Sequence, residues 1–167
     1  MKRIEQALLL TVVILATMGA ADPASRTWTA RLTGGEQNPA VTTKASGTSS
    51  VWLVAFGDSS VHYRIRTSLM TDVTMAHLHS GAKGQNGPVI VTLETPKKTG
   101  KAMVSEGKFH ASDLSGPMAG MDLKAFIASC DSGNVYVNVH TQAHGDGEIR
   151  GQLHHAASAT RTAKKKA

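Results

Sequence analysis

An all-β fold, in the form of an antiparallel sandwich or barrel, is predicted by two features of the sequence. Short runs in which apolar and polar residues alternate recur along the chain, and stretches rich in Gly, Asn and Asp separate them. Such runs are typical of strands that bury one face of a sheet. With 167 residues, of which 41% are hydrophobic, the chain suits one domain with a single core.

The strands are predicted from this alternation. In chain order they cover residues 28–32, 50–56, 61–65, 75–79, 89–93, 135–141 and 149–153. In the first strand Trp28 and Leu32 are expected to face the core, as are Val61 and Ile65 in the third. The run 50–56 is apolar on both faces, which predicts a buried strand that ends in a turn at residues 57–58.

One segment departs from the strand pattern. Apolar residues at i, i + 3, i + 4 and i + 7 predict a short helix near residues 122–130 across one end of the sheets; they are Leu123, Phe126, Ile127 and Cys130. Asp122 is the expected N-cap, and Gly133 follows the end of the helix. Because Cys130 is the only cysteine, an internal disulfide framework is excluded, and we expect this residue to be a small buried hydrophobe.

The first 21 residues have the organisation of a secretory signal peptide. Lys2 and Arg3 precede an apolar stretch over 7–17, and small residues at 19–21 offer a cleavage site. This stretch is too short to span about 30 Å of hydrocarbon comfortably, although an uncleaved anchor is the alternative. We therefore expect a periplasmic or secreted protein of the bacterial type, with no stable membrane anchor after cleavage.

The remaining chain divides into a linker at 22–27, a folded domain at 28–155 and a disordered basic tail at 156–167. The net charge is +6, but four basic residues lie among the last seven, so the body is close to neutral. Only seven residues are aromatic. A nucleic-acid partner is therefore not expected.

Histidines are the residues that indicate chemistry. His77 and His79 form an H-x-H pattern on a predicted strand, so they share the face opposite Leu78, which belongs in the core. They point outward or into a hollow covered by loops. His140 lies on the outward face of the strand 135–141, and would complete a three-imidazole site for copper or zinc if the two strands were neighbours. Unrelated surface histidines are the alternative.

The chain after His140 is predicted to form a hairpin with a three-residue loop, 145–147, in which Gly147 supplies a positive φ. In this register Arg150 lies opposite Gln142, because a shift by one residue would bury its charge in the core. The residues expected on one exposed face are His140, His144, Glu148 and Arg150, with His144 paired across the strands to Glu148.

Four segments resemble the CHRD domain, the module named after its repeats in chordin. They are Gly35–Pro39, Lys44–Gly47, Ala76–Leu93 and Tyr136–Leu153. The resemblance covers about residues 28–155. It implies a Greek-key β-sandwich similar to the barrel of copper–zinc superoxide dismutase.

The more distant similarity to those dismutases implies roles for individual residues. The implied copper ligands are His77, His79 and His140. His144, His62 or water could be the fourth, although His62 is a poor candidate because it belongs to a different outward run. Arg150 would steer an anion toward the copper. The segment between His79 and Pro88 is too short to carry the bridging and zinc ligands of the dismutases, so zinc binding in that mode is not expected.

Three functions stay open at this point. The chain binds copper or another transition metal, or it is a dismutase-like copper redox enzyme, or it is a metal-free module for adhesion or interaction with an unknown protein.

Overall fold

The computed structural model describes residues 26–54, 59–95 and 101–156. The predicted signal segment, most of the linker, the turn at 57–58 and all of the tail beyond Ala156 lie outside these ranges. The strands are β1 (Thr27–Thr33), β2 (Ser46–Val54), β3 (Ser60–Ser68), β4 (Val73–Ser80), β5 (Val89–Leu93), β6 (Ala102–Phe109), β7 (Val135–Thr141), β8 (Ile149–Gln152) and β9 (His154–His155). The helix α1 spans Leu123–Asp131, and short 3-10 helices lie at 34–36, 111–113 and 116–118.

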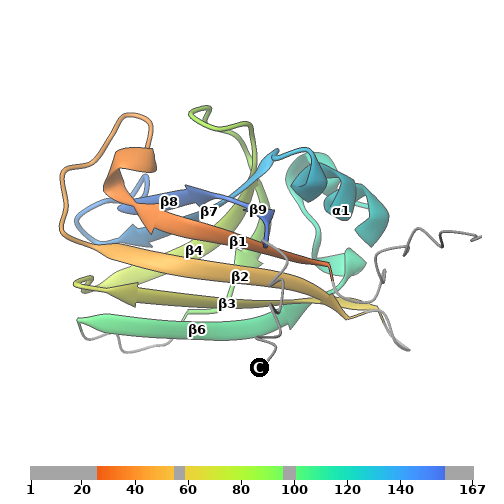
Figure 1. Cartoon of the computed structure of the whole chain (residues 1–167), viewed down its shortest axis with the longest axis horizontal. Coiled ribbons are helices and arrows are strands. Elements are labelled where there is room, and N and C mark those ends of the chain that lie inside the picture. The colour runs from red at the N-terminus through yellow and green to blue at the C-terminus, as the bar shows by residue number, and fades with distance from the viewer. Residues whose placement is uncertain (1–25, 55–58, 96–100, 157–167) are drawn as a thin grey trace, which may run out of the picture.

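The strands form one antiparallel sheet that curls into a nearly closed barrel (Figure 1). Their order is β5-β4-β7-β8-β1-β2-β3-β6, with β9 added to β1. After the β4–β5 hairpin the chain returns to pair β6 with β3. Glu94 links the two edges, because its N–H donates to the Tyr63 hydroxyl of β3 and its carbonyl accepts from the Ser105 hydroxyl of β6. The predicted all-β fold is confirmed.

The core follows the predicted alternation. On β1 and β3 the residues expected to face inward are all buried: Trp28, Ala30, Leu32, Val61, Tyr63 and Ile65. The expected buried strand at 50–56 is partly wrong, because β2 begins at Ser46 and only Ser49 and Val51 are buried on it. Trp52 and Leu53 stay half-buried at the end of the barrel.

The predicted helix is confirmed as α1. The Asp122 side chain accepts from the Ala125 N–H (3.0 Å), and Gly133 has a φ of 69° beyond the C-terminus. Phe126 is buried and packs edge-on against Phe109 of β6, with ring centroids 5.2 Å apart. Cys130 is buried as expected, and this burial raises the pKa of its thiol. None of the helices in the described ranges is long and apolar enough to cross a membrane.

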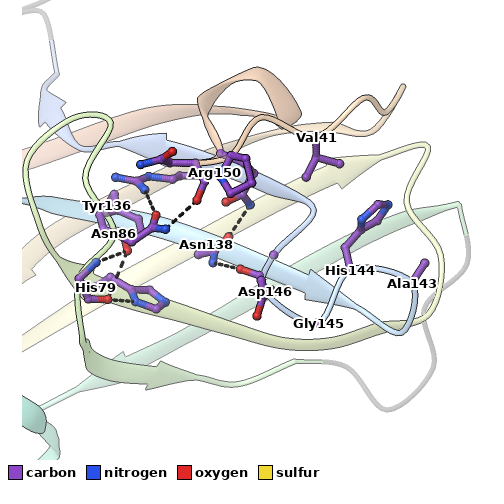
Figure 2. A pocket seen from close by; sticks show the side chains of 15 residues that line it. Val41, His79, Asn86, Tyr136, Asn138, Ala143, His144, Gly145, Asp146 and Arg150 are labelled. Carbon is purple, nitrogen blue, oxygen red and sulfur yellow. Dashed lines mark hydrogen bonds between the residues drawn. The ribbon is translucent and has the colours of Figure 1, made fainter.

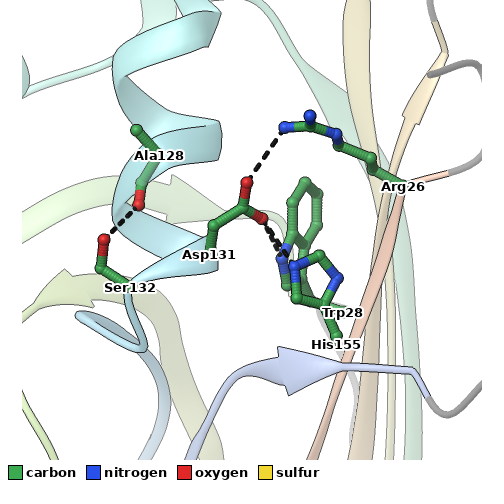
Figure 3. Close-up of polar contacts among 6 residues, drawn as sticks. All are labelled: Arg26, Trp28, Ala128, Asp131, Ser132 and His155. Atoms are coloured by element: carbon green, nitrogen blue, oxygen red, sulfur yellow. Dashed lines mark hydrogen bonds and ion pairs between the residues drawn. The ribbon is translucent and has the colours of Figure 1, made fainter. Parts of the chain in front are cut away.

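One carboxylate ties the helix to both ends of the described chain (Figure 3). Asp131, the last residue of α1, accepts from Arg26 Nη1 (3.0 Å) and from the buried indole of Trp28 (3.1 Å). It also pairs with His155 Nε2 (2.9 Å) on β9. The N–H of Ala156 donates to the Thr27 carbonyl (2.9 Å), so the folded region continues to at least this residue.

Candidate metal centre

Strands β4 and β7 are neighbours, which alternation alone could not predict. In their register His77 lies opposite Asn138 and His79 lies opposite Tyr136. His140 lies opposite Met75, two positions before His77. All three histidines therefore share the face that points away from the core, and one nitrogen of each lies within 4.8 Å of the others. The expected convergence of His77, His79 and His140 is confirmed.

Two of the imidazoles are oriented by backbone carbonyls. His79 Nδ1 lies 2.9 Å from the Gly87 oxygen, and His140 Nδ1 lies 2.9 Å from the Gly145 oxygen. A carbonyl oxygen only accepts, so each Nδ1 carries the proton and each Nε2 presents a lone pair. His140 Nε2 lies 3.1 Å from His77 Nδ1, whereas His79 Nε2 is buried and has no hydrogen-bond partner. The site therefore holds an imidazole lone pair that no described group uses.

Burial keeps the imidazoles of His77 and His79 neutral. The exposed fractions are 9% for His77, 9% for His79 and 6% for His140. Desolvation, followed by the proximity of His140 and His79, lowers the pKa of His77 to about 4. Desolvation also lowers the pKa of His79, against a smaller opposite effect of its bond to Gly87. At neutral pH these two rings are therefore unprotonated, which is the state that a metal ion requires.

The spacing of one pair of nitrogens, from His77 and His140, suits a shared ion. Metal–imidazole bonds are about 2.0–2.1 Å long, so two nitrogens 3.1 Å apart, as in His77 and His140, subtend an angle of about 100° at one ion. This angle lies between the square-planar and tetrahedral values. Among the described residues no second group of three or more His, Cys, Asp or Glu side chains has this property. The donor set is composed of imidazoles alone.

A polar pocket of about 470 Å³ lies beside His79 (Figure 2). Its walls come from the segments 37–41, 86–87 and 143–147, and its floor includes Tyr136 and Asn138 of β7. Gln37 Nε2 donates to Asn138 Oδ1 (2.7 Å), and Asn138 Nδ2 donates to the Asp146 carbonyl (3.0 Å). These interlocked amides were not predicted from the sequence, although Gln37 belongs to the Gly35–Pro39 segment singled out there.

The segments that line the pocket also explain why the predicted exposure of His140 was wrong. The outward face of β7 is covered, so that Tyr136, Asn138 and His140 are buried although they point away from the core. The polar side chains of this face are therefore hydrogen-bonded to Gln37 and to the backbone of the covering loops.

Arg150 is placed differently from the expectation. It lies opposite Asn138, not Gln142, and is only 2% exposed. Its side chain faces the predicted side of the sheet, but neutral oxygens of the segment 82–86 and the ring of Tyr136 surround the guanidinium. The desolvation argument correctly kept Arg150 out of the core, but its expected exposure was wrong, because the loop and Tyr136 cover it and supply acceptors.

The connection after β7 is also longer than predicted. Two successive turns replace the three-residue loop: His144 N–H donates to the Thr141 carbonyl (3.1 Å), and Gly147 N–H donates to the His144 carbonyl (3.0 Å). Gly147 does adopt the expected positive φ, 122°, and a Cβ there would collide with the Asn138 amide.

Glu148 does not pair with His144, contrary to the expectation. It is 9% exposed and accepts from Thr43 Oγ1 (2.6 Å) and Thr141 Oγ1 (2.9 Å). His144 lines the pocket without joining the three clustered imidazoles. His62 lies on β3, 3.1 Å from Ser60 Oγ, and is likewise outside the cluster. Neither supplies a fourth protein ligand in this arrangement.

Comparison with known families gives one match. The family model of the CHRD domain matches residues 28–153, which contain the whole barrel except Thr27 of β1 and the two residues of β9. Among curated proteins, none matches this chain.

Proposed function

The chain belongs to the CHRD domain family, and within that family we propose that it is an exported protein that binds one transition-metal ion through His77, His79 and His140. The single observation that carries the proposal is the buried, unpartnered Nε2 of His79. A buried nitrogen without a hydrogen bond costs about 1–3 kcal/mol, and a bound ion would remove this cost.

Copper is the metal proposed first. Imidazole suits copper and zinc alike, but copper binds most tightly in the divalent series, and no carboxylate or thiolate joins the three rings to favour another ion. Three protein ligands leave a coordination position for water or an external ligand. Bound copper can change its oxidation state, so a dismutase-like redox activity is the second candidate.

Export is part of the proposal. The sequence of residues 1–21 supports it through its basic start and apolar stretch, and CHRD domains are of the extracellular type.

The proposal is tested by titrating the purified, untagged chain with Cu(II) and with Zn(II) in competition with a chromophoric chelator. We expect one ion per chain. The substitution His79→Gln should weaken binding by more than about 100-fold, beyond the 10–100-fold that loss of an outer partner costs. The matched control His62→Gln, which changes a half-buried histidine on β3, should keep wild-type affinity.

Equal binding by wild type, His79→Gln and His62→Gln would show that copper binds elsewhere, and would contradict the proposal. Absence of binding by the wild type would favour the metal-free interaction module. For the redox candidate, dismutation by the copper-loaded chain should disappear in His140→Gln, and activity that persists in this variant would count against it.

A further inference from the structure

The orientation of His79 depends on a loop rather than on its own strand. Its Nδ1 donates to the carbonyl of Gly87, which lies in the segment 81–88 between β4 and β5. If this carbonyl moved, the ring could take the other tautomer or rotate, and Nε2 would no longer present its lone pair to His77 and His140. The position of Gly87 therefore determines the orientation of His79.

Tyr136 holds Gly87 directly. Its hydroxyl accepts from the Gly87 N–H (3.0 Å) and lies 3.3 Å from the Gly87 oxygen. Its ring also stacks on the His79 imidazole, with centroids 4.8 Å apart and planes 9° from parallel. One side chain of β7 thus contacts both partners of the His79–Gly87 hydrogen bond.

Arg150 holds the rest of the loop and the Tyr136 ring together. Its Nη2 donates to the carbonyls of Gln85 (2.7 Å) and Ala82 (3.3 Å), and Nη1 donates to Asn86 Oδ1 (3.0 Å). The guanidinium carbon lies 3.5 Å from the centroid of the Tyr136 ring (Figure 2). One rigid, planar group therefore fixes the positions of three loop residues and of the ring that stacks on His79.

This use of an arginine is energetically expensive. Arg150 is 2% exposed, and the hydrogen-bond acceptors around its guanidinium are neutral carbonyl and amide oxygens. A buried charge without a directly bound carboxylate costs stability, and the geometry that it imposes is a reason for retaining it. Three of its hydrogen bonds are also directed to the loop, which is a poor arrangement for attracting a free anion.

We propose that Arg150 is a positioning residue: it locks the segment 81–87 and Tyr136 so that Gly87 fixes the tautomer and orientation of His79. This inference rests on the proposed function, because the positioning of His79 serves metal binding. The effect of Arg150 on the tautomer of His79, however, is expected in the metal-free chain as well. A lysine in its place keeps the charge but lacks the planar fork that reaches several acceptors at once. The effect of Arg150→Lys therefore separates geometry from charge.

The experiment is nitrogen-15 NMR of the metal-free, full-length chain with labelled imidazoles at neutral pH, followed by Cu(II) titration. In the wild type, His79 Nδ1 should give a protonated-type shift and Nε2 an unprotonated-type shift. In Arg150→Gln and Arg150→Lys the two shifts should move toward each other as the tautomers mix, and copper affinity should fall about 10–100-fold. Arg64→Gln, which removes an exposed arginine paired with Glu106, should change neither readout.

The variant Tyr136→Phe keeps the stacked ring and removes only the hydroxyl that bonds Gly87. It therefore tests whether Gly87 fixes the His79 tautomer if the Arg150 variants do not fold. It should produce the same tautomer mixing. Wild-type shifts and affinity in folded Arg150→Gln, or wild-type shifts in Tyr136→Phe, would overturn the inference. If the wild type binds no metal but the tautomer changes occur, the proposed function fails and the positioning role stands.

Discussion

Two walls of the barrel, a solvated wall formed by β3 and β6 and a buried wall that includes β7, differ in the exposure of their outward side chains. On β3 the outward residues Arg64 and Arg66 are exposed, and Arg64 pairs with Glu106 of β6 in solvent. On β7 the outward residues Asn138 and His140 are as buried as the core, because the segments 37–41, 86–87 and 143–147 lie over them. The same alternation of apolar and polar residues therefore describes a solvated face and a buried polar face.

This difference determines which polar groups matter energetically. An exposed ion pair exchanges water for a partner at little net gain, whereas a buried polar group must be satisfied or costs its full desolvation. On the buried face, desolvation lowers the pKa of His77 and His79. These imidazoles are therefore neutral and can bind a metal ion in a low dielectric. The following predictions contrast the two walls.

The largest contrast is expected between two glutamates. Glu148→Ala should destabilise the chain by about 3 kcal/mol, because it leaves the hydroxyls of Thr43 and Thr141 without their buried acceptor. Glu106→Ala removes an exposed partner of Arg64 and should cost less than about 1 kcal/mol. Urea unfolding of both variants measures the difference. Equal losses would mean that the two walls do not differ in this way.

A second contrast concerns pH. Unfolded histidine titrates near pH 6.5, whereas the pKa of His77 in the folded chain is about 4. Between these values the unfolded chain binds a proton that the folded chain does not, so the stability of metal-free protein should fall as the pH falls from 6.5 to 4. His77, together with the effect of its histidine neighbours, should contribute at most about 3 kcal/mol to this loss, and no further loss should arise from it below pH 4.

The measurement is the free energy of unfolding of chelator-treated protein at several pH values. His77→Gln should reduce the dependence in this window, and the lowered pKa of His79 should account for part of what remains. A wild-type slope that persists in His77→Gln would assign the effect to other groups.

The sequence predicted the face that each side chain occupies better than it predicted how deeply that side chain is buried. It placed His77, His79 and His140 on outward faces and Phe126 and Cys130 on the buried side of a helix, because the period of a strand or helix is set by the backbone. It could not predict that β4 lies beside β7, since that pairing joins residues 55 to 68 positions apart.

The errors at Arg150 and Glu148 have one cause. Charged side chains were expected in solvent, whereas neutral oxygens, hydroxyls and an aromatic ring satisfy them beneath the loops. The same reasoning fixed only the face of Arg150 in the hairpin, so the register was wrong by an even number of residues: the face was right and the partner was wrong. Loop coverage depends on contacts between distant segments, which no local pattern encodes.

The smallest contrast is expected at the junction of α1 with the two ends of the sheet. Asp131→Asn keeps an acceptor for the Trp28 indole but removes the charge that pairs with Arg26 and His155, both of which are largely exposed. The loss should be about 0.5–1 kcal/mol in thermal unfolding. Asp122→Asn is the control, because asparagine caps a helix as well as aspartate does. A loss above about 2 kcal/mol would show that this junction behaves like the buried wall.

Electron paramagnetic resonance of the chain loaded with one equivalent of Cu(II) tests the three-imidazole site most directly. Nitrogen hyperfine coupling should report three imidazole ligands in the wild type and two in His79→Gln, with the wild-type pattern retained in His62→Gln. A spectrum of free or carboxylate-bound copper, or one that His79→Gln leaves unchanged, would contradict a metal centre built from His77, His79 and His140.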